Sequence, residues 1–150
     1  MLEAGSKAPA FTLISDEGKK VSLKDLAGKK VVLYFYPRDM TPGCTKEACS
    51  FSENISKLQK AGAVVLGVSA DSVDSHRKFR EKYKLAFNLL SDPDRAVIQK
   101  YGVWQEKNMY GKKSMGIVRS TFVIDESGKI AHVFSRVKVD GHTEAVLKKL

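Results

Sequence analysis

Apolar positions along the chain alternate between runs typical of buried strands and spacings typical of amphipathic helices. Residues 30–36 (KVVLYFY) and 63–70 (AVVLGVSA) are near-continuous apolar runs, which predict central strands buried on both faces. Between them, residues 42–60 place apolar side chains at steps of three and four, which predicts a helix closed by Gly62. Residues 71–84 show the same spacing, with an inward-facing stripe made of Val73, His76, Phe79 and Tyr83. This strand–helix–strand order indicates parallel strands.

Shorter elements complete the pattern. Two hairpins are predicted, one from residues 11–14 and 20–23 and the other from residues 121–124 and 130–134. The remaining segments are a strand at 87–90, a helix from Ser91 to Tyr101, a mixed loop over 103–118 and a final helix over 141–150. We therefore expect one α/β domain over residues 1–150, with a central mixed β-sheet flanked by helices.

The composition excludes several classes of protein. A chain of 150 residues that is 43% hydrophobic and 29% charged is long enough to bury a core, and is not typical of disorder. It has no apolar run near the ~20 residues of a membrane span and no visible signal peptide, which favours a cytoplasmic protein. Two cysteines are too few for a disulfide scaffold or a four-cysteine zinc site. In the cytoplasm, such a pair is more often catalytic or redox-sensing.

The net charge of +9 is unevenly distributed. Residues 1–75 hold 10 Lys+Arg and 9 Asp+Glu (net +1), whereas residues 76–150 hold 16 and 8 (net +8). A basic half could bind nucleic acid or another polyanion. However, the densest part, His76 to Lys84, places its cations beside the apolar stripe of a predicted helix, as a solvated helix face does. We expect neither a specific nucleic-acid partner nor a membrane partner.

The candidate chemistry lies where the first central strand leads into the following helix. Thr41 suits the N-cap, Pro42 suits the first helical position, and Cys44 then stands at about the third. Unpaired N–H groups and the helix dipole favour a negative charge there, and therefore the nucleophilic thiolate of Cys44. The alternative, an inert buried cysteine, is disfavoured by this placement at the end of a strand, where ligands bind in α/β sheets.

Cys49 follows five residues later. In an intact helix the two Cα atoms would be ~9 Å apart, whereas a disulfide needs roughly 4.4–6.8 Å. A permanent disulfide is therefore not expected, although a conditional one could form if the first helical turns unwind. Cys49 could equally be an ordinary buried cysteine. The spacing differs from the Cys-x-x-Cys of thioredoxin-type reductases, and the scattered histidines do not favour a metal site.

Peroxide reduction fits a reactive thiolate with a second thiol nearby. The thiolate attacks the O–O bond and becomes a sulfenic acid, which condenses with the second thiol, and an external dithiol resets the pair. Helix-start N–H groups, the Thr41 hydroxyl and a guanidinium could hold the peroxide and stabilise the departing oxyanion. A thiol redox sensor without turnover is the alternative.

These residues resemble a known family. The pattern Pro37-x-x-x-Thr41-x-x-Cys44 is similar to the signature of the peroxiredoxins, which are thioredoxin-fold thiol peroxidases. The fuller stretch YFYPRDMTPGCTKEACSF resembles their bacterioferritin comigratory protein (peroxiredoxin Q) branch, and LLSDPD, RSTFVID and VDGH extend the resemblance over essentially the whole chain. It implies a thioredoxin-like fold with an N-terminal β-hairpin.

The resemblance also implies roles for individual residues. Cys44 would be the peroxidatic nucleophile, and Cys49 would resolve its sulfenic acid as an intramolecular disulfide. Thr41 would hydrogen-bond the peroxide, and Pro37 would shield the sulfur from solvent. Arg119, in RSTFVID, would stabilise the thiolate and polarise the peroxide.

Two further positions and the partners complete these expectations. Glu47 would hold an arginine in place, and Trp104 is either part of the pocket wall or a packed aromatic. The substrates would be hydrogen peroxide and organic hydroperoxides, and the reductant a thioredoxin-like or glutaredoxin-like dithiol. The resemblance implies a monomer that needs no cofactor and no metal.

Overall fold

A computed structural model describes the backbone of residues 1–150 and every side chain except that of Met109. Its main sheet has seven strands in the order β2-β1-β5-β4-β3-β8-β9. They are β1 (Thr12–Ser15), β2 (Lys20–Ser22), β3 (Lys30–Phe35), β4 (Ala63–Ser69), β5 (Asn88–Ser91), β8 (Ser120–Ile124) and β9 (Ile130–Ser135). β3 and β4 are parallel, as are β4 and β5, whereas β1/β2 and β8/β9 form antiparallel hairpins. The expected mixed sheet and both predicted hairpins are confirmed.

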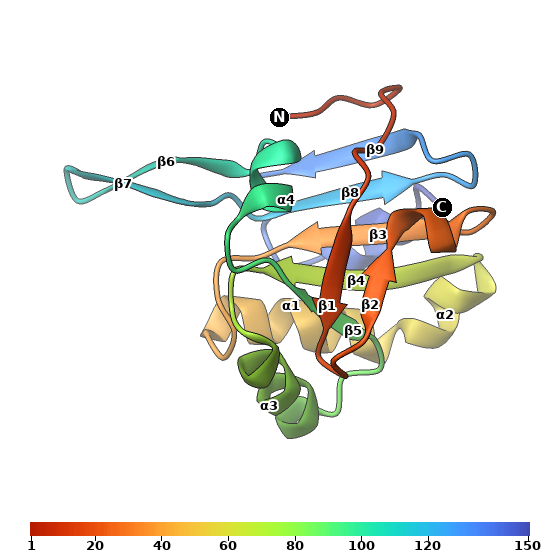
Figure 1. Cartoon of the computed structure of the whole chain (residues 1–150), viewed down its shortest axis with the longest axis horizontal. Helices are drawn as coiled ribbons and strands as arrows, with labels where there is room; N and C mark the ends of the chain where they lie inside the picture. The colour runs from red at the N-terminus through yellow and green to blue at the C-terminus, as the bar shows by residue number, and fades with distance from the viewer.

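Helices cover both faces of this sheet. They are α1 (Pro42–Glu53), α2 (Ile55–Lys60), α3 (Val73–Tyr83), α4 (Ala96–Lys100) and α5 (His142–Leu147), with a 3-10 turn over Leu23–Leu26. Alternate residues of β3 point to opposite faces: Val31, Leu33 and Phe35 pack in the apolar cluster that includes α4, and Val32 and Tyr34 in the cluster that includes α1. In Figure 1, α4 accordingly lies on the near side of the strands and α1 on the far side. Because β3 is buried on both faces, its position in the core is well defined. The loop that connects its carboxyl end to α1 therefore begins at a fixed point.

The helix expected over residues 42–60 is two helices instead. The prediction was wrong at Asn54, whose φ of −102° and ψ of 13° interrupt the helix. The side-chain amide of Asn54 donates to the carbonyl of Ser50 at 2.8 Å, which satisfies a carbonyl group near the end of α1. As a result, α1 is a separate segment of 12 residues between the end of β3 and Asn54.

Residues 103–118 are not the mixed loop expected from the sequence. They contain a hairpin of β6 (Trp104–Met109) and β7 (Lys112–Ile117), which forms a separate two-stranded sheet. Figure 1 shows this hairpin extending away from the main sheet. At its turn, Tyr110 and Gly111 both have positive φ, 54° and 79°, as a tight two-residue hairpin turn requires. Because the first four residues of β7 are exposed, the sequence of this strand shows no alternation of apolar and polar residues.

The helix after β5 begins later than predicted, at Ala96 and not at Ser91. The carboxylate of Asp92 accepts a hydrogen bond from the Ile98 N–H at 2.8 Å, and Arg95 adopts a φ of 62° immediately before the helix. In the part of the chain that the structure describes, no helix is long and apolar enough to cross a membrane.

Candidate active site

Cys44 lies at the start of α1, just beyond the carboxyl end of β3. Thr41 occupies the N-cap position with an extended backbone (φ −78°, ψ 153°), and Pro42 is the first helical residue, so that Cys44 is the third, as expected. The side chain of Cys44 is only 1% exposed and belongs to the apolar cluster that includes Tyr36 and Ala48. The sulfur is therefore enclosed by protein on the side of the core.

The hydroxyl of Thr41 does not cap α1, although the residue stands at the N-cap. Its Oγ1 donates to the carbonyl of Arg38 at 2.9 Å, and its side chain accepts no N–H of the helix. The Thr41 side chain thus closes the loop that precedes α1, and leaves the N–H groups of the first turn to other acceptors.

Arg119 connects this helix start to the other half of the chain. It lies between β7 and β8, and its Nη2 is 3.2 Å from Sγ of Cys44. Its Nη1 donates to Oε1 of Glu47 at 2.6 Å. Arg119 and Glu47 are 17% and 1% exposed, so the guanidinium is held in place with little competition from water. Three of the residues singled out in the sequence are therefore brought together.

Glu47 is a carboxyl group in an unusual environment. Burial raises its pKa from the ordinary 4.5 to about 7, although the positive charge of Arg119 acts in the opposite direction. Its second oxygen, Oε2, is buried and has no hydrogen-bond partner among the described residues, which agrees with a carboxyl group that protonates easily. The Glu47–Arg119 contact is thus sensitive to pH near neutrality.

Gly43 is a site residue that the sequence reasoning missed. A Cβ atom at this position would lie 3.2 Å from Nη2 of Arg119, closer than most Cβ contacts. The absence of a side chain at Gly43 is what lets the guanidinium approach the start of α1. The only signal in the sequence was a poor helix former at the second position of a helix, directly before Cys44.

For the other expected residues, all of which the structure describes, no hydrogen bond or ion pair with Cys44 defines a role. Pro37 is half-buried in the loop after β3, and its shielding of Cys44 stays a prediction. Cys49 is half-buried on the same continuous helix as Cys44, and both are free thiols. Trp104 packs against the core, with the guanidinium carbon of Arg95 4.6 Å from its ring centroid, which favours the interpretation as a packed aromatic.

A cleft of about 580 Å³ opens beside Arg119, between β6 and the segment after β9. Lys107 and Arg136 also line it, so three of its side chains carry positive charge. The pKa of Lys107 is lowered by partial burial and by the neighbouring charge of Arg119, while Cys44 has the opposite effect. Arg119 thus lines an open, positively charged cleft.

With this geometry established, comparisons with known proteins decide the family. The model of the AhpC/TSA family matches residues 4–133. The chain belongs to the AhpC/TSA family. A Coxiella burnetii relative named bcp is 58% identical over 99% of both chains, and the peroxiredoxin Bcp of Escherichia coli K12 is 47% identical over 99% of this chain and 96% of its own. This peroxiredoxin thus groups with the bacterioferritin comigratory proteins, as the sequence motifs indicated.

Solved structures of that branch have the same fold as this peroxiredoxin. The bacterioferritin comigratory protein of Xanthomonas campestris, studied for its alkyl peroxide reduction activity, superposes with a TM-score of 0.91 at 43% identity, over 97% of this chain and 96% of its own. A cysteine-to-serine mutant of the peroxiredoxin Q of Xylella fastidiosa gives a TM-score of 0.93 at 37% identity, over 99% of this chain and 94% of its own. The expected thioredoxin-like fold is confirmed.

Proposed function

We propose that this peroxiredoxin reduces peroxides with Cys44 as the nucleophile. The observation that carries the proposal is the 3.2 Å contact between Nη2 of Arg119 and Sγ of Cys44, at a helix start where negative charge is favoured. The thiolate attacks one peroxide oxygen, the O–O bond breaks, and a sulfenic acid forms on Cys44. The departing oxyanion takes up a proton and leaves as water or an alcohol, and Arg119 stabilises its charge until then.

The second step of the proposed cycle joins Cys44 to Cys49. The Cys49 thiol attacks the sulfenic sulfur, an S–S bond forms, and water leaves. Five residues of intact helix hold the two side chains too far apart, so α1 must first unwind. The polar contacts of α1 with the C-terminal segment, Lys46 with Asp140 and Ser50 with Thr143, then have to open.

The remaining roles and partners follow from this cycle. Thr41 would hydrogen-bond the bound peroxide, and Pro37 would limit access of water to the sulfur. We assign hydrogen peroxide and organic hydroperoxides as substrates, and a thioredoxin-like or glutaredoxin-like dithiol as the reductant of the Cys44–Cys49 disulfide. We place the protein in the cytoplasm, where thiols stay reduced, as a monomer with one domain over residues 1–150.

The experiment uses two serine variants. Cys44→Ser should lose all peroxide consumption. Cys49→Ser should consume one equivalent of peroxide and then stop, because the sulfenic acid has no thiol within the chain to resolve it. Mass spectrometry of the oxidised wild type should find a Cys44–Cys49 bond. Normal turnover of Cys49→Ser with thioredoxin would contradict intramolecular resolution, and peroxide consumption without turnover in the wild type would favour a redox sensor.

Nucleic-acid binding gains no support from the basic helix α3. Arg77 and Lys78 both pair with Asp74 of the same helix, and Arg80 pairs with Asp16 at 3.0 Å. Cations already paired with carboxylates contribute less to binding phosphates, so the excess of positive charge on this helix is better explained by a solvated surface.

A further inference from the structure

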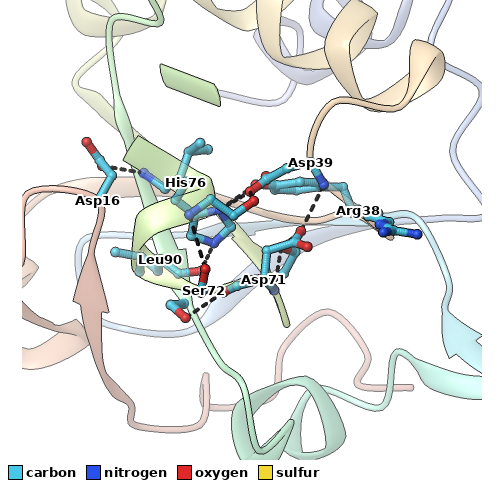
Figure 2. A network of polar contacts seen from close by, with 12 residues as sticks. Asp16, Arg38, Asp39, Asp71, Ser72, His76 and Leu90 are labelled. Atoms are coloured by element: carbon cyan, nitrogen blue, oxygen red, sulfur yellow. Dashed lines mark hydrogen bonds and ion pairs between the residues drawn. The ribbon is translucent and has the colours of Figure 1, made fainter. Parts of the chain in front are cut away.

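A buried polar network ties the loop between β3 and α1 to the rest of the molecule (Figure 2). Its centre is Asp39, which is 5% exposed. One carboxylate oxygen, Oδ1, accepts from the Tyr36 hydroxyl at 2.6 Å, and the other, Oδ2, accepts from the Ser75 hydroxyl at 2.8 Å. Oδ2 also lies 2.7 Å from Nδ1 of His76, a fully buried residue of α3. None of these side chains is hydrogen-bonded to the sulfur of Cys44, whose polar contact within the described residues is with Arg119.

Both ring nitrogens of His76 are engaged in hydrogen bonds. Its Nε2 lies 2.9 Å from the carbonyl oxygen of Leu90, which can only accept, so Nε2 carries a hydrogen. Its Nδ1 lies 2.7 Å from Oδ2 of Asp39 and 3.4 Å from the Tyr36 hydroxyl, so this nitrogen is hydrogen-bonded to the side chains of the loop. Asp39 and His76 are therefore joined by a buried hydrogen bond, with side-chain exposures of 2% and 0%.

The backbone of the same loop is also held. The N–H of Asp39 donates to Oδ2 of Asp71 at 2.8 Å, just beyond β4. That carboxylate accepts from Ser69 at 2.6 Å as well, and the Asp71 carbonyl accepts from Ser91 of β5 at 2.6 Å. The side chain of Asp39 thus connects the loop to α3, and its N–H group connects the loop, through Asp71, to β4 and β5.

The same three residues could be mistaken for a metal site. Ligand atoms of Asp39, Asp71 and His76 lie within 4.8 Å of one another. The three groups already have protein partners, however: Nε2 of His76 donates to Leu90, Oδ2 of Asp39 contacts Ser75 and His76, and Oδ2 of Asp71 accepts from the Asp39 N–H and from Ser69. The hydrogen bonds therefore describe a polar cross-link and not a cation site.

The contacts of α1 differ from those of the loop. Its polar contacts with the rest of the molecule include an exposed Lys46–Asp140 pair, the half-buried Ser50–Thr143 bond and the buried Glu47–Arg119 contact, whose carboxyl group has a raised pKa. We propose that the Asp39–His76 pair is a positioning device, which keeps residues 36–41 fixed while α1 unwinds, so that movement in the catalytic cycle begins between Thr41 and Pro42. The proposal rests on resolution of Cys44 by Cys49, as proposed above.

Two opposite effects follow for the reaction. Without the pair, the loop would move together with α1, so the folded arrangement that places Cys44 against Arg119 would be populated less, and attack on peroxide would slow. The unwound arrangement would be populated more, so disulfide formation would accelerate. A general loss of catalytic competence would not move the two steps in opposite directions.

Two substitutions of His76 separate its two hydrogen bonds. In His76→Asn, the amide nitrogen takes the place of Nδ1 and keeps a hydrogen bond to Asp39. In His76→Gln, the amide nitrogen takes the place of Nε2 and keeps only the donor to Leu90. Rapid-quench mass spectrometry would follow sulfenic acid and disulfide formation separately, with Ser72→Ala as the control, because Ser72 caps α3 by accepting from the Ser75 N–H without touching Asp39.

We expect His76→Gln to react with peroxide about tenfold more slowly and to form the disulfide about tenfold faster, in line with the rate cost of small displacements in an active site. His76→Asn and Ser72→Ala should stay within about threefold of wild type in both steps, because both keep a hydrogen bond from residue 76 to Asp39. Equal changes in the two His76 variants, or slowing of both steps in His76→Gln, would overturn the proposal.

A measurement on the wild type applies even if the variants fold poorly. Hydrogen exchange of reduced and oxidised protein should show loss of protection over residues 42–53, with protection kept at the Asp39 amide and over α3. A Cys44–Cys49 disulfide accompanied by loss of protection at Asp39 would refute the positioning role and leave the proposed function intact. Absence of that disulfide in the oxidised protein would refute both.

Discussion

Nη2 of Arg119 lies 3.2 Å from Sγ of Cys44, although 75 residues separate the two in the chain. The contact exists because β3 and β8 are neighbours in the sheet, so that the segment before β8 starts beside the segment after β3. Strand pairing deep in the core thus sets the position of a positive charge at the surface of α1.

Replacing Arg119 with lysine tests the two-sided contact of the guanidinium. A lysine cannot reach Cys44 and Glu47 with two separate donors, as Arg119 does. We expect Arg119→Lys to slow peroxide attack about 10²- to 10³-fold, the usual cost of losing one donor to a developing anion. The second-order rate with hydrogen peroxide measures this. Arg136→Lys, in the same cleft, is the matched control, and an equal loss there would point to general charge effects.

Gly43→Ala should separate stability from activity. Alanine is a better helix former than glycine by about 1 kcal/mol, so α1 should not be weakened. The new methyl group would lie 3.2 Å from Nη2 of Arg119, however, and would push the guanidinium away from Cys44. We expect unfolding in urea at an equal or higher concentration, with peroxide attack slowed about tenfold. Unchanged attack would show that Arg119 shifts without consequence.

Glu47 should make the stability of the reduced protein depend on pH. Its folded pKa of about 7 exceeds the ordinary 4.5, so the folded state holds this proton more tightly than the unfolded chain. The resulting stabilisation is full below pH 4.5, falls as the pH rises, and is lost above about pH 7. It amounts to about 3 kcal/mol.

Urea unfolding of wild type and Glu47→Gln at pH 5 and pH 8 measures this contribution. The free energy of unfolding of the wild type should fall relative to that of the variant by most of this amount between the two pH values. Parallel changes in the two proteins would mean that Glu47 stays ionised across this range.

Cys49 should remain a thiol at neutral pH. Partial burial, and then the negative charge of Glu53, raise its pKa above the ordinary 9.0. In a Cys44→Ser background, alkylation of Cys49 by iodoacetamide should therefore have its midpoint above pH 9, and Glu53→Gln should move it to lower pH. Glu81→Gln, on α3, is the control. A midpoint unmoved by Glu53→Gln would show that the charge of Glu53 does not reach the thiol.

The sequence predicts the parts of the fold that burial dictates. A run such as KVVLYFY needs apolar surroundings on both faces, so it identifies β3 and, with the following cap and proline, the start of α1. The hairpin of β6 and β7 was not predicted, because β7 is largely exposed and its sequence contains no apolar run that burial would require. The break at Asn54 depends on one side-chain hydrogen bond that local spacing does not reveal.

In the candidate site, too, the sequence predicts the residues whose role depends on local structure and not the contacts between distant segments. Cys44 and Thr41 are identified by their places at a helix start, which is local information. The contact of Arg119 with Cys44 depends on strand order, and in the sequence only the family resemblance indicates it. His76 stood on an apolar stripe as a lone polar residue, but nothing in the sequence placed Asp39 opposite its ring.

Burial of the sulfur of Cys44 also governs the order in which other molecules can meet it. A side chain that is 1% exposed offers almost no surface to a partner of protein size, whereas the proposed substrate, a peroxide, is a small molecule. In the proposed cycle, only the unwound, oxidised chain presents this sulfur to a protein dithiol. If the cycle runs as proposed, the electron donor meets this sulfur after the peroxide has reacted and not before, so resting protein would not compete for the donor.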